Sequence, residues 1–156
     1  MPHARSALRA LRTTAGLSLG QWAALGQAAV WVVGTRAALA VLPWRRVSAA
    51  FERTAARPGP PDWDRARRVQ WAVGSVARRL LPARPCLTQA LVARELLRRQ
   101  GVETALKIGA AREPEGSFRA HAWLEHRGRT VMGQVHSDVP YTPFRTAAEK
   151  AAPPAP

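Results

Sequence analysis

The sequence predicts an α+β fold in which a helical first half is followed by a small antiparallel sheet. Apolar residues recur at helical spacing up to about residue 99. Three short segments after residue 103 have the composition of strands, and Arg127-Gly128 between two of them is a two-residue turn of the kind found in β-hairpins. Helices and strands in separate parts of one chain are typical of the α+β class.

Proline and glycine divide the 156 residues into three parts. Residues 1–57 form a basic lead-in and a helical segment that Pro43 interrupts. The prolines of Arg57-Pro58-Gly59-Pro60-Pro61 exclude regular structure and predict a linker. Residues 58–146 form the core of the domain, and residues 147–156 are expected to be a disordered tail.

Two helices are expected at the start of this core. Asp62 or Asp64 caps the first, and the second runs from Cys86 to about Arg99, where Gly101 ends it. Residues at helical spacing in the first are Val69, Ala72, Val73, Val76 and Leu80, and in the second Leu87, Ala90, Leu91, Ala93, Leu96 and Leu97. Strands are then expected at 104–111, 118–126 and 129–134.

Cys86 is the only cysteine, and it stands at the start of a predicted helix directly after Pro85. Proline is favoured at the entry to a helix. The free N–H groups and the dipole of the first turn stabilise a thiolate and can bind an oxyanion. The position therefore suits a cysteine nucleophile, although a lone cysteine is more often a small buried apolar residue.

His121 lies on a predicted strand about 35 residues after Cys86 and is the candidate general base. If Arg127-Gly128 is the turn, His121 faces Gln134, and Trp123 faces Met132, across the hairpin. Gln134 is then placed to orient the imidazole through its amide oxygen, as a neutral amide does in papain-like proteases. Asp138 is the alternative orienter, because a one-residue change at the turn would break the pairing.

Together these segments resemble the transglutaminase-like protease subunit of lasso-peptide biosynthesis. The similarity covers residues 60–146 and extends to Leu42-Pro43-Trp44-Arg45-Arg46. The segments that carry it are Cys86-Leu87, Leu96 to Gly101, Leu106 to Gly109, and Ala120-His121-Ala122-Trp123-Leu124-Glu125 with Gly128-Arg129.

This resemblance implies a papain/transglutaminase-like cysteine protease core that removes the leader from a lasso precursor peptide. It also implies a separate leader-recognition protein as a partner, with the macrolactam-forming cyclase as a further one. Cys86 and His121 match the first two members of the implied Cys-His-Asp triad. The aspartate expected after the Gly128-Arg129 turn is missing, and Gly133-Gln134 stands in its place.

The formal net charge is +14, which raises the question of nucleic-acid binding. The arginines are dispersed along the helices rather than clustered, so nucleic acid is not the favoured partner. Thr13 to Thr35 carries no charge, and peripheral membrane contact is a further expectation. An inactive transglutaminase-like scaffold that binds peptides is the main alternative function, and a basic nucleic-acid or membrane-surface protein is another.

A single cysteine excludes an internal disulfide and fits a reducing compartment, so we expect a cytoplasmic location. The four histidines are scattered and have no zinc-ligand spacing. No metal or other cofactor is therefore expected.

Overall fold

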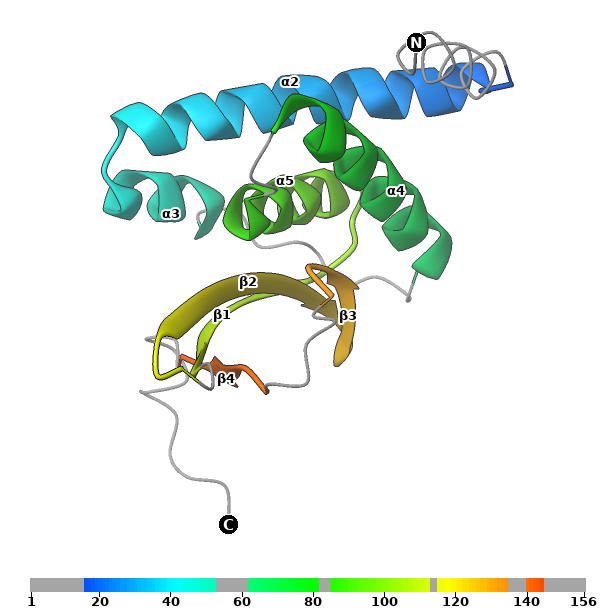
Figure 1. Ribbon diagram of the computed structural model, residues 1–156. Coiled ribbons are helices and arrows are strands. Elements are labelled where there is room, and N and C mark those ends of the chain that lie inside the picture. Colours follow the sequence, from blue (N-terminus) through cyan, green and yellow to red (C-terminus); the bar gives the residue numbers. More distant parts are fainter. Residues whose placement is uncertain (1–15, 53–61, 82–84, 113–114, 135–139, 145–156) are drawn as a thin grey trace, which may run out of the picture.

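The computed structural model describes residues 16–52, 62–81, 85–112, 115–134 and 140–144. Helices lie on one face of a four-stranded antiparallel sheet (Figure 1). The α+β class is thereby confirmed. The predicted linker at 57–61 and the predicted tail at 147–156 lie outside the described residues.

Helix α2 (Leu19–Val41) begins at Ser18, whose side chain accepts from the Gln21 N–H while the Gln21 side chain bonds the Ser18 N–H. This reciprocal pair satisfies two of the N–H groups that a helix start leaves free. Pro43 follows, and α3 (Trp44–Glu52) begins after it. The predicted break at Pro43 is therefore confirmed.

Helix α4 (Trp63–Leu80) is capped by Asp62, whose carboxylate accepts from the Arg65 N–H at 2.8 Å. Of the two candidate caps, Asp62 is thus the one used. Helix α5 (Cys86–Arg99) has the bounds that the periodicity predicts, and Gly101 ends it at φ 77°. Positive φ favours glycine, because it has no Cβ to clash.

The sheet consists of β1 (Ala105–Arg112), β2 (Phe118–His126), β3 (Arg129–Met132) and β4 (Thr142–Pro143), in the order β3-β2-β1-β4. Three of these strands are predicted by the sequence. The third ends at Met132 rather than at residue 134, and β4 is an addition.

The core lies between the helices and one face of the sheet. Leu106 on β1 and Leu124 on β2 are directly paired, and both pack against the buried cluster. Besides Leu124, that cluster takes Ala28 and Val32 from α2, Val69, Val73 and Val76 from α4, and Val92, Leu96 and Leu97 from α5. The helical first segment and the protease-like core therefore share one apolar core.

Candidate active site on the two sides of the sheet

Cys86 is the first residue of α5 and is half-buried. Pro85 precedes it with φ −62°, and its carbonyl accepts from the Gln89 N–H at 3.2 Å. Earlier N–H groups of the turn have no acceptor inside the helix. The first turn holds no acidic residue, so no negative side chain there opposes a thiolate or an oxyanion.

His121 lies on β2, and its Nε2 is 2.7 Å from the carbonyl oxygen of Gly133. A carbonyl can only accept a hydrogen bond, so Nε2 donates and carries the ring proton. The lone pair of the neutral imidazole is then on Nδ1. The ring is flanked by Tyr141, with ring centroids 5.2 Å apart, and by Trp123, which is stacked at 6.2 Å. A main-chain oxygen thus sets the tautomer of the candidate base.

The predicted pairing of His121 with Gln134 is wrong. His126 pairs with Arg129 and Glu125 with Thr130, as the two-residue turn predicts, but Leu124 rather than Trp123 then pairs with Met132. One extra residue on β3, a β-bulge, shifts everything beyond it by one position.

Gln134 is exposed just beyond the end of β3, and the His121 ring bonds to Gly133 instead. The other candidate orienter, Asp138, lies outside the described residues. Neither residue is therefore placed beside the imidazole by the structure.

Gly133 occupies a position that accepts no side chain. Its φ is +78°, and a Cβ built there would lie 2.6 Å from the Ala122 carbonyl oxygen and 3.0 Å from the Trp123 Cα. The strand after the turn is where the family resemblance places an aspartate. In this backbone conformation a carboxylate-bearing residue does not fit, and the glycine carbonyl contacts the histidine in its stead.

The structure does not bring Cys86 and His121 together. Side chains alternate between the two faces of a strand. Leu124 points into the core beneath α5, so His121, three residues away, points to the other face. The Trp123 indole N–H donates to the Glu125 carboxylate, and Trp123 also stacks on His121, which groups all three on that outer face.

A second histidine of β2, His126, is on the α5 side but at the wrong end of it. Its Nδ1 is 2.6 Å from the Glu103 carbonyl, and its ring packs edge-on against Trp63 at 4.9 Å. Glu103 follows the C-terminus of α5, whereas Cys86 opens that helix about 20 Å away along its axis. His126 is a core residue rather than a base for the thiol.

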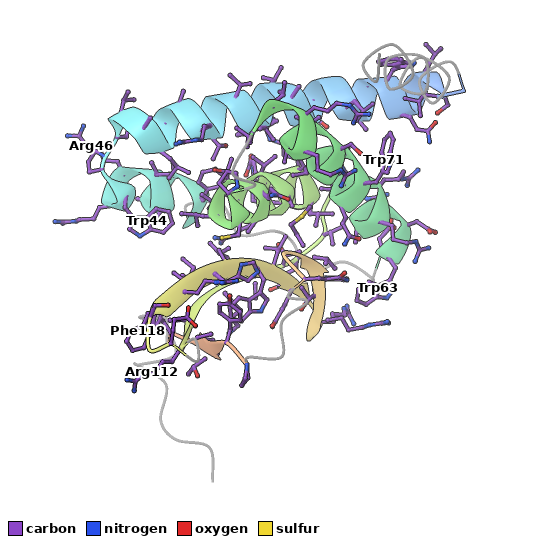
Figure 2. All side chains as sticks on the ribbon, viewed as in Figure 1. Trp44, Arg46, Trp63, Trp71, Arg112 and Phe118 are labelled. Atoms are coloured by element: carbon purple, nitrogen blue, oxygen red, sulfur yellow. The ribbon has the colours of Figure 1, made fainter. Side chains whose placement is uncertain are left out.

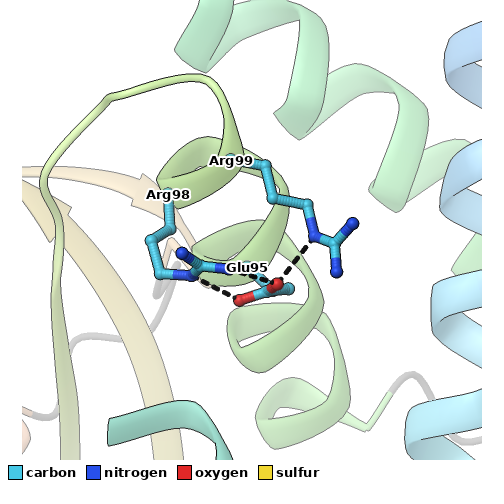
Figure 3. Close-up of polar contacts among 3 residues, drawn as sticks. All are labelled: Glu95, Arg98 and Arg99. Carbon is cyan, nitrogen blue, oxygen red and sulfur yellow. Dashed lines mark hydrogen bonds and ion pairs between the residues drawn. The ribbon is translucent and has the colours of Figure 1, made fainter. Parts of the chain in front are cut away.

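Sequence reasoning also missed the ion pairs of α5. The buried Glu95 carboxylate bonds to Arg98 at 2.7 and 2.8 Å and to Arg99 at 2.7 Å (Figure 3). The Arg98 hydrogen bond is the main cause of the lowered pKa of Glu95, and Arg99 adds to it against the opposing effect of burial. Their spacing of three and four residues on one helix was the signal available in the sequence.

The described residues contain no group of three or more His, Cys, Asp or Glu side chains arranged to hold a metal ion.

The sequence was compared with models of known protein families. The profile of the transglutaminase-like superfamily matches residues 29–146, which is more than half of the sequence. The chain belongs to this superfamily. Searches of curated proteins and of solved structures found no match.

The match begins inside α2 and extends past β4. The fold of this superfamily is commonly that of a cysteine protease. Here the helix-start cysteine and the strand histidine are present, on α5 and β2.

Proposed function

We propose that this protein is a cysteine peptidase that removes the leader from a lasso precursor peptide, with Cys86 as nucleophile and His121 as base. The observation that carries the proposal is Cys86 itself, the first residue of a buried helix in a chain of the transglutaminase-like superfamily. Its resemblance to the lasso-peptide protease subunit supplies the substrate class.

The reaction is acyl transfer to water. His121 Nδ1 takes the thiol proton, and the Cys86 sulfur attacks the scissile carbonyl carbon. N–H groups of the first turn of α5 hold the resulting oxyanion. The imidazolium then gives its proton to the leaving amine as the C–N bond breaks. Water hydrolyses the thioester, which yields the free carboxylate and restores the thiol.

This chemistry requires His121 to reach the α5 side of the sheet. A shift of one residue along a strand moves its side chains to the opposite face. The bulge at Leu124/Glu125 adds its extra residue to β3, so this shift must be made by β2 itself against α5. We therefore propose that the isolated chain is held in an inactive arrangement, and that the leader and a separate leader-binding protein favour the active one.

The sheet itself offers little surface for reading a leader. Peptides are often bound as an added strand at a free sheet edge. The two edges here are β3, with four residues, and β4, with two. Because both edge strands are short, a separate protein is expected to recognise the leader. The cyclase that uses the freed peptide is a further partner in the same cytoplasmic pathway.

The test is a cleavage assay on the precursor encoded with this chain, with and without the leader-binding protein. Cleavage is expected to rise at least about tenfold when that protein is added, because it favours the active arrangement. Cys86→Ala abolishes the activity, while Cys86→Ser serves as the near-isosteric check that the fold is intact. Equal rates with and without the partner would contradict the split-subunit proposal.

One observation favours a second candidate, an inactive scaffold that binds peptides. Cys86 and His121 lie on opposite sides of the sheet, and Gly133 excludes the usual acid. A scaffold would bind leader peptide and the leader-binding protein but leave the precursor intact under every condition. Unchanged precursor in the complete mixture, with binding retained, would establish this alternative.

A further inference from the structure

The outward face of α2 carries an apolar stripe. Its exposed fractions reach 89% at Leu19, 49% at Trp22, 73% at Val30, 57% at Val33 and 77% at Val41. These positions fall on one side of the helix at its period of 3.6 residues. Contiguous exposed apolar surface of this kind marks a binding surface.

The opposite side of α2 is fixed to the rest of the domain. Ala28, Val32 and Thr35 are buried, and the Arg99 guanidinium lies 4.6 Å from the centre of the Trp31 ring. Arg99 also bonds to Glu95, so this contact joins α2 to α5. In Figure 1, α2 lies across the outside of α4 and α5. Its stripe therefore faces away from the domain.

Basic and aromatic side chains are exposed on the helices that flank α2. Beyond the C-terminal end of α2, Arg45 and Arg46 are exposed on α3, and the exposed Trp44 lies on the side of α3 away from α2 (Figure 2). On the side of α2 that faces α4, near the N-terminal turns of α2, a hollow of about 350 Å³ is lined by Arg67, Arg68 and Trp71, among others. Tryptophan and arginine beside an apolar surface are the groups that settle at the headgroup level of a bilayer.

We propose that this face binds the surface of an anionic membrane, with α2 lying in the plane of the interface. The net charge of +14 is complementary to acidic lipid headgroups and opposes docking of a second copy. A protein interface carries about one hydrogen bond per 100–200 Å². The stripe residues named above have no polar side-chain atom except the Trp22 N–H, which suits acyl chains better.

By length and composition α2 is apolar enough to cross a membrane. Crossing would strip the core of Ala28 and Val32 and place the Arg99 contact of Trp31 in hydrocarbon. The buried inner side of α2 thus favours the in-plane position, with the rest of the domain on the aqueous side of the headgroups.

The experiment is co-sedimentation of the full chain with vesicles of phosphatidylcholine alone and of phosphatidylcholine with phosphatidylglycerol. We expect at least about tenfold tighter binding to the anionic vesicles, which added salt weakens. Val30→Glu/Val33→Glu reduces this binding at least about tenfold, because it places charge on the inserted face. Both side chains are exposed, so the fold is not expected to change.

The matched control is Phe118→Glu/Phe144→Glu. It replaces two other exposed apolar residues, at 75% and 56%. Phe118 lies at the end of the sheet away from α2 (Figure 2), and Phe144 directly follows β4. This control should leave vesicle binding within about twofold of wild type, since the same charge change is made outside the contact. Reversing the charge with Arg45→Glu/Arg46→Glu should weaken binding to anionic vesicles only.

Two results would overturn the proposal. One is the absence of binding to anionic vesicles, or binding that Val30→Glu/Val33→Glu leaves unchanged. The other is loss of binding to the leader-binding protein in that variant without any vesicle binding, which would assign the stripe to a protein. Neither readout depends on peptide cleavage, so failure here is separate from failure of the peptidase proposal.

Discussion

The two faces of the sheet carry different halves of the proposed chemistry. On the α5 side, Cys86 opens a buried helix whose free N–H groups suit an oxyanion. On the outer face, His121 is held by Gly133 and flanked by Tyr141 and Trp123. The difference teaches that a correct order of motif residues along the chain does not settle whether their side chains meet. The phase of a single strand decides that.

Of the variants that compare the two faces, the one that removes the histidine of the outer face is expected to change precursor cleavage most. His121→Ala should reduce precursor cleavage by about 10²- to 10⁴-fold, the usual contribution of a general base. The control is His126→Ala on the α5 side, which should lower the melting temperature but retain most cleavage at low temperature. A larger loss of cleavage in His126→Ala than in His121→Ala, measured where both variants are folded, would show that His126 and not His121 is the base.

Gly133 contacts His121 through its carbonyl and lies against the backbone of β2 at Ala122 and Trp123. Substituting it is expected to lower the stability of the fold. Gly133→Ala should destabilise the fold by about 1–3 kcal/mol, because it combines positive φ with a Cβ too close to the Ala122 carbonyl. Urea unfolding measures the change. Gly128→Ala is the comparison, since its φ of 75° carries the same strain while nothing lies within 4 Å of its Cβ position. Equal losses in the two would remove the argument from close contact.

On the α5 side, the ion pairs of Glu95 contribute to the stability of the fold. Its pKa is lowered in the folded state, first by the Arg98 hydrogen bond, so its ionised form stabilises the protein at neutral pH. That contribution is present above the pKa of the unfolded chain, about 4.3, and is lost as the pH falls through the lower folded value.

Glu95→Gln should therefore cost about 1–3 kcal/mol at pH 7. The gap to wild type should narrow as the pH falls below about 4. Thermal unfolding of the two proteins across this range measures it, and a gap that stays constant with pH would show that the ion pairs are not its cause.

The smallest effect is expected at Gln134. Because the β-bulge moves it out of line with His121 and its side chain is exposed, Gln134→Ala should change cleavage by less than about threefold. A loss of a hundredfold or more would mean that the active arrangement has the pairing without the bulge. That result would sharpen the comparison by showing that Gln134 faces His121 in that arrangement.

Much of the fold follows from local patterns. The apolar spacing of α5, the Asp62 cap and the Arg127-Gly128 turn are decided within a few residues. The sequence predicts the spacing and the turn, and it narrows the cap to Asp62 or Asp64. The bulge in β3 depends instead on how Val131 and Met132 both become buried against the helices, which no local pattern reveals. The prediction that Gln134 pairs with His121 was wrong because of this bulge.

The same limit applies to the candidate site. Composition and motif order indicate Cys86 and His121, and the family match over residues 29–146 spans both positions. The role of a backbone carbonyl at Gly133 leaves no trace in side-chain chemistry, and the side of the sheet on which His121 lies depends on long-range packing of Leu124. Both features had to come from the structure.

The central claim is that Cys86 and His121 act as a pair only when the leader complex is assembled. Because the chain has one cysteine, its rate of alkylation by iodoacetamide, followed by mass spectrometry, reports on Cys86 alone. The proteins to compare are wild type and His121→Ala, each free and each with the leader-binding protein and a leader peptide that ends before the cleavage site.

We predict equal alkylation rates for the two free proteins, since His121 is then on the far face. In the complex the wild-type rate should rise at least about tenfold, and that of His121→Ala should not, because a nearby imidazole adds to the thiolate that the helix start alone supports. Equal rates for wild type and His121→Ala in the complex would contradict the account and leave the protein a peptide-binding scaffold.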